Sequence, residues 1–176
     1  MSAKQDFLEA ILLTPKMPGG VPVMSPFHGS DYYYLRKPIF WKPEGAEAGQ
    51  FQEIDVPTGF VTDLASVPQM FWSLLPRDGA YLHAAIVHDY SYWTQSQPRD
   101  TADAVLKIGM QELQVASWKI AAIYSGVRAP FVGGARSWAT NAALKAAGEK
   151  RILKRFPNDP RTTWADWKKQ PDVFVS

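Results

Sequence analysis

The stretch AAIVHDYSYW, residues 84–93, begins with four apolar residues and then places His88 directly before Asp89. Three aromatic residues follow within the next four positions. An ionisable pair among apolar and aromatic side chains must be satisfied or used, because unpaired burial costs several kcal/mol. The stretch therefore indicates a packing position, a metal site or a catalytic pair, carried on a helix over residues 80–94.

The composition of the chain limits its possible fold classes and functions. With 176 residues, 46% of them hydrophobic and 20% charged, the chain is long enough for one compact domain with a substantial core. A net charge of +2 gives no electrostatic argument for nucleic-acid binding. The absence of cysteine excludes disulfides, thiolate metal sites and a cysteine nucleophile. The first residues lack the pattern of a signal peptide, so we expect a product made in the cytoplasm.

The predicted fold class is α+β, with a small antiparallel β-sheet packed on a helical layer that contains an antiparallel HD-motif helix pair. Residues 31–155 are expected to form this single domain, after an N-terminal arm or linker over 1–30 and before an extended C-terminal arm over 156–176. The expected elements are a helix over 6–13, strands over 31–41 and 51–57, a crossing segment over 58–76, and helices over 80–94, 101–113, 116–128 and 135–154, the last possibly broken near Gly148.

His88 lies on one side of this helix, in a stripe with Tyr81, Ala84 and Tyr92. It therefore faces the part of the protein that this stripe covers. Asp89 lies about 100° around the helix from His88, so it is not the direct partner of the His88 ring. A histidine that acts as a general base usually has a carboxylate that fixes its tautomer. His88 therefore needs a carboxylate from another element, or is a satisfied core histidine, and Asp89 is free for a cation or an arginine.

Asp103 is the candidate partner, because the short turn over 95–100 folds the next helix back towards His88. The alternative for Asp103 is a capping box with Asp100, in which it favours the start of its own helix. Asp63, in GFVTDLASVP, is a candidate metal ligand on a loop, and its alternative is a local cap for the backbone that follows.

The basic residues Arg128 and Arg136 and the Lys/Arg set over 145–155 are interpreted as solvated helix faces. The C-terminal arm holds three prolines and two tryptophans, and it is too polar to form its own core. Its aromatic residues predict that it docks on this protein or on a neighbour.

With both motifs in view, the chain resembles a family of uncharacterised phage and prophage proteins. The shared pattern is VPxGFxTDxASVP, then AAxxHDxxY and a helix containing Ala-Asp, and it covers roughly residues 37–135. In this chain it includes Asp63, His88, Asp89 and Asp103.

The run from HDYSY through DTADAVL to WKIAAIYSGVRAPF also resembles the helical core of phospholipase A2. This resemblance implies that His88 activates a water, that Asp103 orients His88, and that Asp63 and Asp89 bind calcium. From the two resemblances we expect a virion-associated structural or adaptor protein of a phage, in the tail or injected, that carries a phospholipase-A2-like site. The alternative is an active calcium-dependent hydrolase of lipid or other envelope esters. The expected partners are other phage structural proteins, or further copies of the chain, through the two arms, with no specific nucleic acid.

Overall fold

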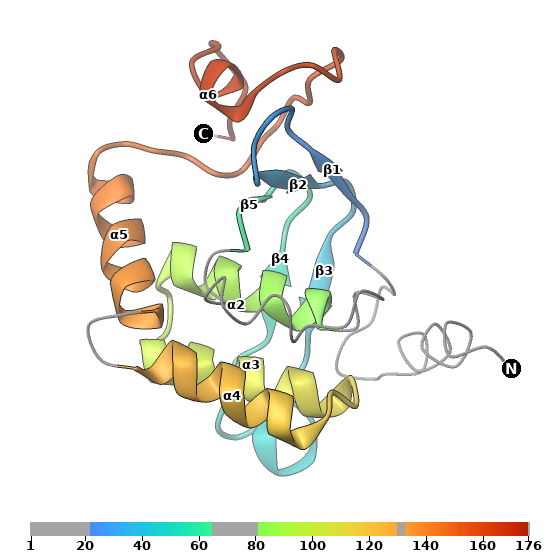
Figure 1. Ribbon diagram of the computed structural model, residues 1–176, viewed down its shortest axis with the longest axis vertical. Helices are drawn as coiled ribbons and strands as arrows, with labels where there is room; N and C mark the ends of the chain where they lie inside the picture. Colours follow the sequence, from blue (N-terminus) through green and yellow to red (C-terminus); the bar gives the residue numbers. More distant parts are fainter. Residues whose placement is uncertain (1–21, 65–80, 130–132, 176) are drawn as a thin grey trace, which may run out of the picture.

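The computed structural model describes residues 22–64, 81–129 and 133–175 (Figure 1). The helix expected over 6–13 and the crossing residues 65–76 lie outside these ranges. The described elements are β1 (Met24–Pro26), β2 (Tyr33–Leu35), β3 (Ile39–Trp41), the 3₁₀ turn η1 (Gly45–Glu47), β4 (Ile54–Val56), β5 (Val61–Thr62), α2 (Leu82–Thr94), α3 (Arg99–Glu112), α4 (Ser117–Arg128), α5 (Gly134–Ala146) and α6 (Trp164–Trp167).

Two small antiparallel sheets form the β part, which confirms the predicted α+β class. One sheet has the order β1-β2-β5, and the other pairs β3 with β4 so that Ile39 lies opposite Val56. The single strand predicted over 31–41 is wrong, because β2 and β3 are separate strands in different sheets. Pro38 stands between them and has no N–H to give to a ladder, which favours a break there.

Helix α2 is the centre of the molecule (Figure 1). Ten of its thirteen residues are buried, as expected for a helix covered on all sides. It contacts β3, β4 and β5, and it also packs against α3 and α5. The short connection from α2 to α3 makes these two packed helices an antiparallel pair, as predicted.

The last predicted helix is shorter than expected, since α5 ends at Ala146 and Gly148 adopts a left-handed φ of +86°. The following residues instead run beside β5, where the Val61 N–H donates to the Arg151 carbonyl at 2.7 Å. Gly59 makes this approach possible, because a Cβ there would lie 2.1 Å from the Leu153 carbonyl oxygen. The glycine of VPTGF is thus required for the packing of residues 151–153 on β5.

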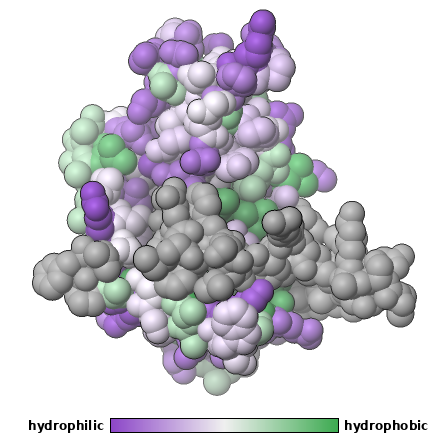
Figure 2. Space-filling model, in the orientation of Figure 1, coloured by the Kyte–Doolittle hydropathy of each residue, from purple (hydrophilic) through white to green (hydrophobic). Residues whose placement is uncertain are grey.

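The C-terminal residues pack on this chain's own three-stranded sheet. Trp164 and Val173 are buried, and Leu153 forms a β-bridge with Phe174. The surface around α6 is mostly hydrophilic on the face shown in Figure 2. The apolar cluster beneath consists of Phe27, Tyr34, Val61, Leu153 and Trp164, with Tyr32, Phe156, Trp167 and Phe174 packed against it.

This cluster also includes part of the segment assigned to the N-terminal arm. Phe27 is 2% exposed, and β1 pairs with β2 along Met24–Pro26. Residues 22–30 therefore contribute to the described fold. Among the described helices, none combines the length and apolar character needed to cross a bilayer.

Candidate functional site

His88 and Asp103 form a buried hydrogen-bonded pair between α2 and α3. The distance between His88 Nε2 and Asp103 Oδ1 is 2.9 Å, and neither side chain is exposed to solvent. The predicted partnership is confirmed. The capping-box alternative for Asp103 is wrong, because α3 begins at Arg99 after Pro98, so Asp103 lies beyond the first turn with its side chain on His88.

The geometry fixes the tautomer of His88. A carboxylate offers only acceptors, so Nε2 carries the hydrogen and donates it to Asp103. In the neutral ring the lone pair is then on Nδ1. Nδ1 is buried and has no hydrogen-bond partner among the residues that the structure describes. The ring is therefore oriented as a base, with the accepting nitrogen unused.

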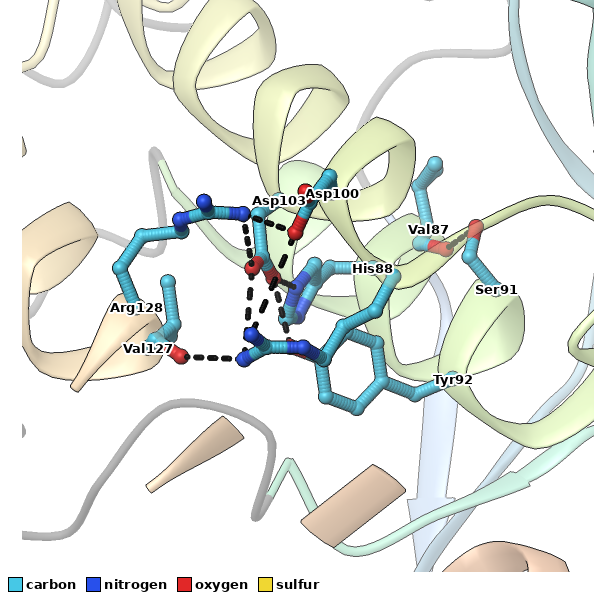
Figure 3. Close-up of polar contacts among 9 residues, drawn as sticks. Val87, His88, Ser91, Tyr92, Asp100, Asp103, Val127 and Arg128 are labelled. Carbon is cyan, nitrogen blue, oxygen red and sulfur yellow. Dashed lines mark hydrogen bonds and ion pairs between the residues drawn. The ribbon is translucent and has the colours of Figure 1, made fainter. Parts of the chain in front are cut away.

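Asp103 is held by three further side chains (Figure 3). The Tyr92 hydroxyl donates to the same Oδ1 at 2.6 Å, and Arg99 and Arg128 place Nη1 atoms 3.8 Å and 3.6 Å from Oδ2. Burial and the hydrogen bond to Asp103 raise the pKa of Tyr92 well above its usual value, so the hydroxyl stays protonated and donates. Arg128 also pairs with Asp100.

These additional residues were not predicted as part of the site, although two of them had a signal in the sequence. Tyr92 follows His88 by one helical turn, so both side chains reach the same side of α2. Arg99 precedes Asp103 by four residues on α3, the spacing of a helical ion pair. Arg128 is exposed, as interpreted, but its guanidinium also reaches the buried Asp103 carboxylate from α4, a contact that only tertiary packing brings about.

Asp63 and Asp89 both lie in the electrostatic environment of one buried arginine, Arg151. Its Nη1 is 3.9 Å from Asp63 Oδ2, and its side chain is 3% exposed. The Thr62 hydroxyl donates to Asp89 Oδ2 at 2.5 Å. Arg151 is therefore not on a solvated helix face, which corrects the interpretation of the basic residues over 145–155 at this position.

The charge of Arg151 bears on the predicted calcium ligands. Burial is the largest single influence and lowers the pKa of this guanidinium, but Asp63, Asp89, Tyr32 and Glu149 together raise it by more, so the group remains a cation. Calcium takes six to eight oxygen ligands. Within the described ranges, no group of three or more His, Asp or Glu side chains is arranged to hold a metal ion. The two carboxylates thus already have a protein cation beside them, and they do not by themselves form a calcium shell.

His83, the other buried histidine of α2, is separate from this site. It is 1% exposed, and neither ring nitrogen has a hydrogen-bond partner among the described residues. Burial lowers its pKa from 6.5 to about 4. The folded chain therefore holds His83 neutral at a pH where the unfolded chain binds a proton.

This difference predicts an acid-dependent loss of stability. As the pH falls from about 6.5 to about 4, the unfolded state gains a proton that the folded state does not, and the free energy of unfolding should fall by roughly 3 kcal/mol. Urea denaturation across this range should show a flatter profile for His83→Leu. The exposed His28 provides the control, since His28→Leu should keep the wild-type profile. An unchanged pH dependence in His83→Leu would contradict the assignment.

The predicted site residues lie within the part of the chain that matches a known protein family. Residues 43–127 match the family described as "Protein of unknown function (DUF1353)", and this range contains Asp63, His88, Asp89 and Asp103. The chain is also 42% identical over 74 residues to the "Uncharacterized protein y4jT" of Sinorhizobium fredii, which covers 41% of this chain and 22% of that protein. The chain thus spans about a fifth of the length of this relative. No solved structure matches.

These matches confirm that the chain is similar to uncharacterised proteins. The phage and phospholipase A2 parts of the resemblance stay predictions.

Proposed function

We propose that the protein is a hydrolase in which His88, held by Asp103, activates water for attack on an ester. The observation that carries the proposal is the unused Nδ1 of His88, opposite a ring nitrogen bound to a carboxylate. His83, the other buried histidine of α2, has two ring nitrogens without a partner among the described residues but no carboxylate, so the Asp103 carboxylate on Nε2 is what distinguishes His88. A general base needs the accepting Nδ1 for the proton of its water.

In the proposed reaction, Nδ1 takes a proton from a water whose oxygen bonds to the ester carbonyl carbon. The imidazolium then returns this proton to the alkoxide oxygen as the carbon–oxygen bond to the leaving group breaks. Asp103 orients the ring and stabilises its positive charge, while Tyr92, Arg99 and Arg128 hold Asp103. Because His88 is fully buried, the packing over Nδ1 must open to admit the ester.

Calcium at Asp63 and Asp89 stays a prediction from the resemblance. Arg151 competes with a metal ion for the same carboxylates, so the proposed steps run through His88 and Asp103 alone. The resemblance to phospholipase A2 makes lipid and other envelope esters the substrate class to test first.

The test is hydrolysis of a panel of acyl esters and phospholipid vesicles by the full chain, with calcium and with a chelator. We expect His88→Gln to lower kcat/KM at least about a hundredfold, the usual contribution of a general base. His28→Gln changes the same residue type at an exposed position and should keep wild-type activity. Activity that survives in His88→Gln would contradict the proposal, and so would a panel on which the wild-type chain is inactive.

The second candidate is a virion-associated structural or adaptor protein of a phage. The complete burial of the His88–Asp103 pair favours it, since a sealed pair serves as a folding element. The C-terminal segment, expected to dock on this protein or on a neighbour, packs on its own domain. The adaptor role and incorporation into a virion therefore rest on the resemblance. It predicts that purified phage particles contain the protein, which mass spectrometry of the particles would detect.

A further inference from the structure

Helix α5 begins directly against two of the groups around Asp103. Gly134, the first residue of α5, is buried. A Cβ at this position would lie 2.5 Å from the Tyr92 hydroxyl oxygen and 2.4 Å from the Val127 carbonyl oxygen. Any larger residue would have to displace one or both of these groups, because close-packed heavy atoms do not approach to such distances. The main chain of α5 therefore takes the space beside both of them.

The two groups beside the start of α5 act on the two oxygens of the Asp103 carboxylate. The Tyr92 hydroxyl donates to Oδ1, the oxygen that also lies 2.9 Å from His88 Nε2. The Val127 carbonyl accepts a hydrogen bond from Arg99 Nη1 at 3.3 Å, and the same Nη1 lies 3.8 Å from Oδ2 (Figure 3). The position of α5 is thus linked to both sides of the carboxylate that orients the ring of the proposed base.

Further contacts fix α5 on the C-terminal part of α2. Trp138, one turn into α5, lies edge-on to the ring of Tyr92, with 5.1 Å between the ring centroids and 87° between the ring planes. The Trp138 carbonyl accepts a hydrogen bond from Gln95 Nε2 at 2.9 Å. Lys145 Nζ donates to the Thr94 carbonyl at 2.8 Å, at the end of α2. These contacts oppose a movement of α5 away from α2, so the first turn of α5 stays against Tyr92.

We propose that α5 positions the base of the proposed hydrolase site, with Gly134 and Trp138 as positioning residues. They act on Tyr92, whose hydroxyl shares one Asp103 oxygen with the His88 ring. A shift of the hydroxyl changes the charge on this shared oxygen and the place where it holds the ring. Both affect proton transfer at the opposite ring nitrogen. The catalytic consequence rests on the proposed function, whereas the contact between α5 and Tyr92 can be tested without activity.

The first test is Gly134→Ala, whose methyl group has to displace the Tyr92 hydroxyl. We expect kcat for ester hydrolysis to fall at least about tenfold with KM little changed, because a small misplacement of a supporting group lowers the rate of the chemical step. Trp138→Leu, which adds no clash, should lower kcat in the same direction by a smaller factor. Gly49→Ala is the matched control, since a Cβ at Gly49 meets nothing within 4 Å and should leave kcat unchanged.

A double-mutant cycle separates positioning from a general loss of stability. Tyr92→Phe removes the hydroxyl that the new methyl group would meet, whereas the contact with the Val127 carbonyl remains. If Gly134 acts through this hydroxyl, Gly134→Ala should lower kcat at least about tenfold in the wild-type background but less than about twofold in Tyr92→Phe. A fall by the same factor in both backgrounds would assign Gly134 a merely structural role and would overturn the proposal.

A measurement without substrate keeps the proposal testable even if no ester is hydrolysed. The Tyr92 hydroxyl donates to a buried carboxylate at 2.6 Å, so its proton should give a downfield NMR signal that exchanges slowly with water and is absent from Tyr92→Phe. This signal should move, or exchange faster, in Gly134→Ala and Trp138→Leu but not in Gly49→Ala. Such changes in an inactive chain would support the positioning of Tyr92 and contradict only the hydrolase function. An unchanged signal in folded Gly134→Ala would overturn the inference itself.

Discussion

Replacing Asp103 with asparagine should lower the free energy of unfolding by roughly 3–5 kcal/mol, the usual cost of removing one partner from a buried ionic pair. The variant keeps the size of the side chain but leaves two arginines and the His88 ring around a neutral amide. One amide oxygen also cannot replace both carboxylate oxygens as acceptor. Urea denaturation followed by circular dichroism would measure the change.

Asp100→Asn is the matched control, because it makes the same chemical change three residues before Asp103, on an exposed side chain. Asp100 is 70% exposed and pairs with Arg128 at the surface. Exposed ion pairs contribute about 0–1 kcal/mol, so this variant should stay close to wild type. Equal losses in the two variants would mean that the burial of Asp103 adds nothing to its contribution.

Deleting residues 157–176 should abolish cooperative unfolding of the isolated chain. The deletion removes Trp164, Trp167, Val173 and Phe174 from the cluster that covers the β1-β2-β5 sheet. A buried tryptophan alone contributes about 3–5 kcal/mol, and whole domains are stable by only about 5–15 kcal/mol. Loss of the thermal transition, together with exposure of the sheet to proteolysis, is the expected result.

A pair of point variants refines this test without shortening the chain. Trp164 is 4% exposed and Trp118 is 61% exposed. Trp164→Ala should therefore cost about 3–5 kcal/mol, whereas Trp118→Ala should cost about 0.5 kcal/mol or less. A truncated monomer that remains folded would show that the C-terminal segment is an independent arm, as the adaptor function requires.

Local patterns in the sequence were sufficient to predict the helices around the site. The observed bounds of α2, α3 and α4 lie within two residues of the predicted ones. The short turn between α2 and α3 then predicted that Asp103 reaches His88, since packed neighbouring helices with a short connection run antiparallel. The break of the last helix near Gly148 was likewise visible in the sequence, because glycine readily adopts a left-handed backbone.

The short strands were harder to predict, since they depend on partners rather than on local preference. β1 has three residues and pairs with β2 from a segment rich in proline and glycine. Nothing in its own sequence distinguishes it from a linker. The strand predicted over 31–41 similarly joins two sheets, and the position of the division depends on which strand each part meets.

By itself the sequence predicted the central helix pair, the residues that it carries and Asp103 as the candidate partner of His88; the structure decided against the capping alternative. Only the tertiary structure decided which cation accompanies Asp63 and Asp89, because Arg151 is more than sixty residues from Asp89 and reaches it through the packing of residues 151–153 on β5. The same packing turned the C-terminal tryptophans onto their own domain. Helical periodicity is a local property that the sequence records, whereas the partner of a buried charge is set by contacts between distant segments.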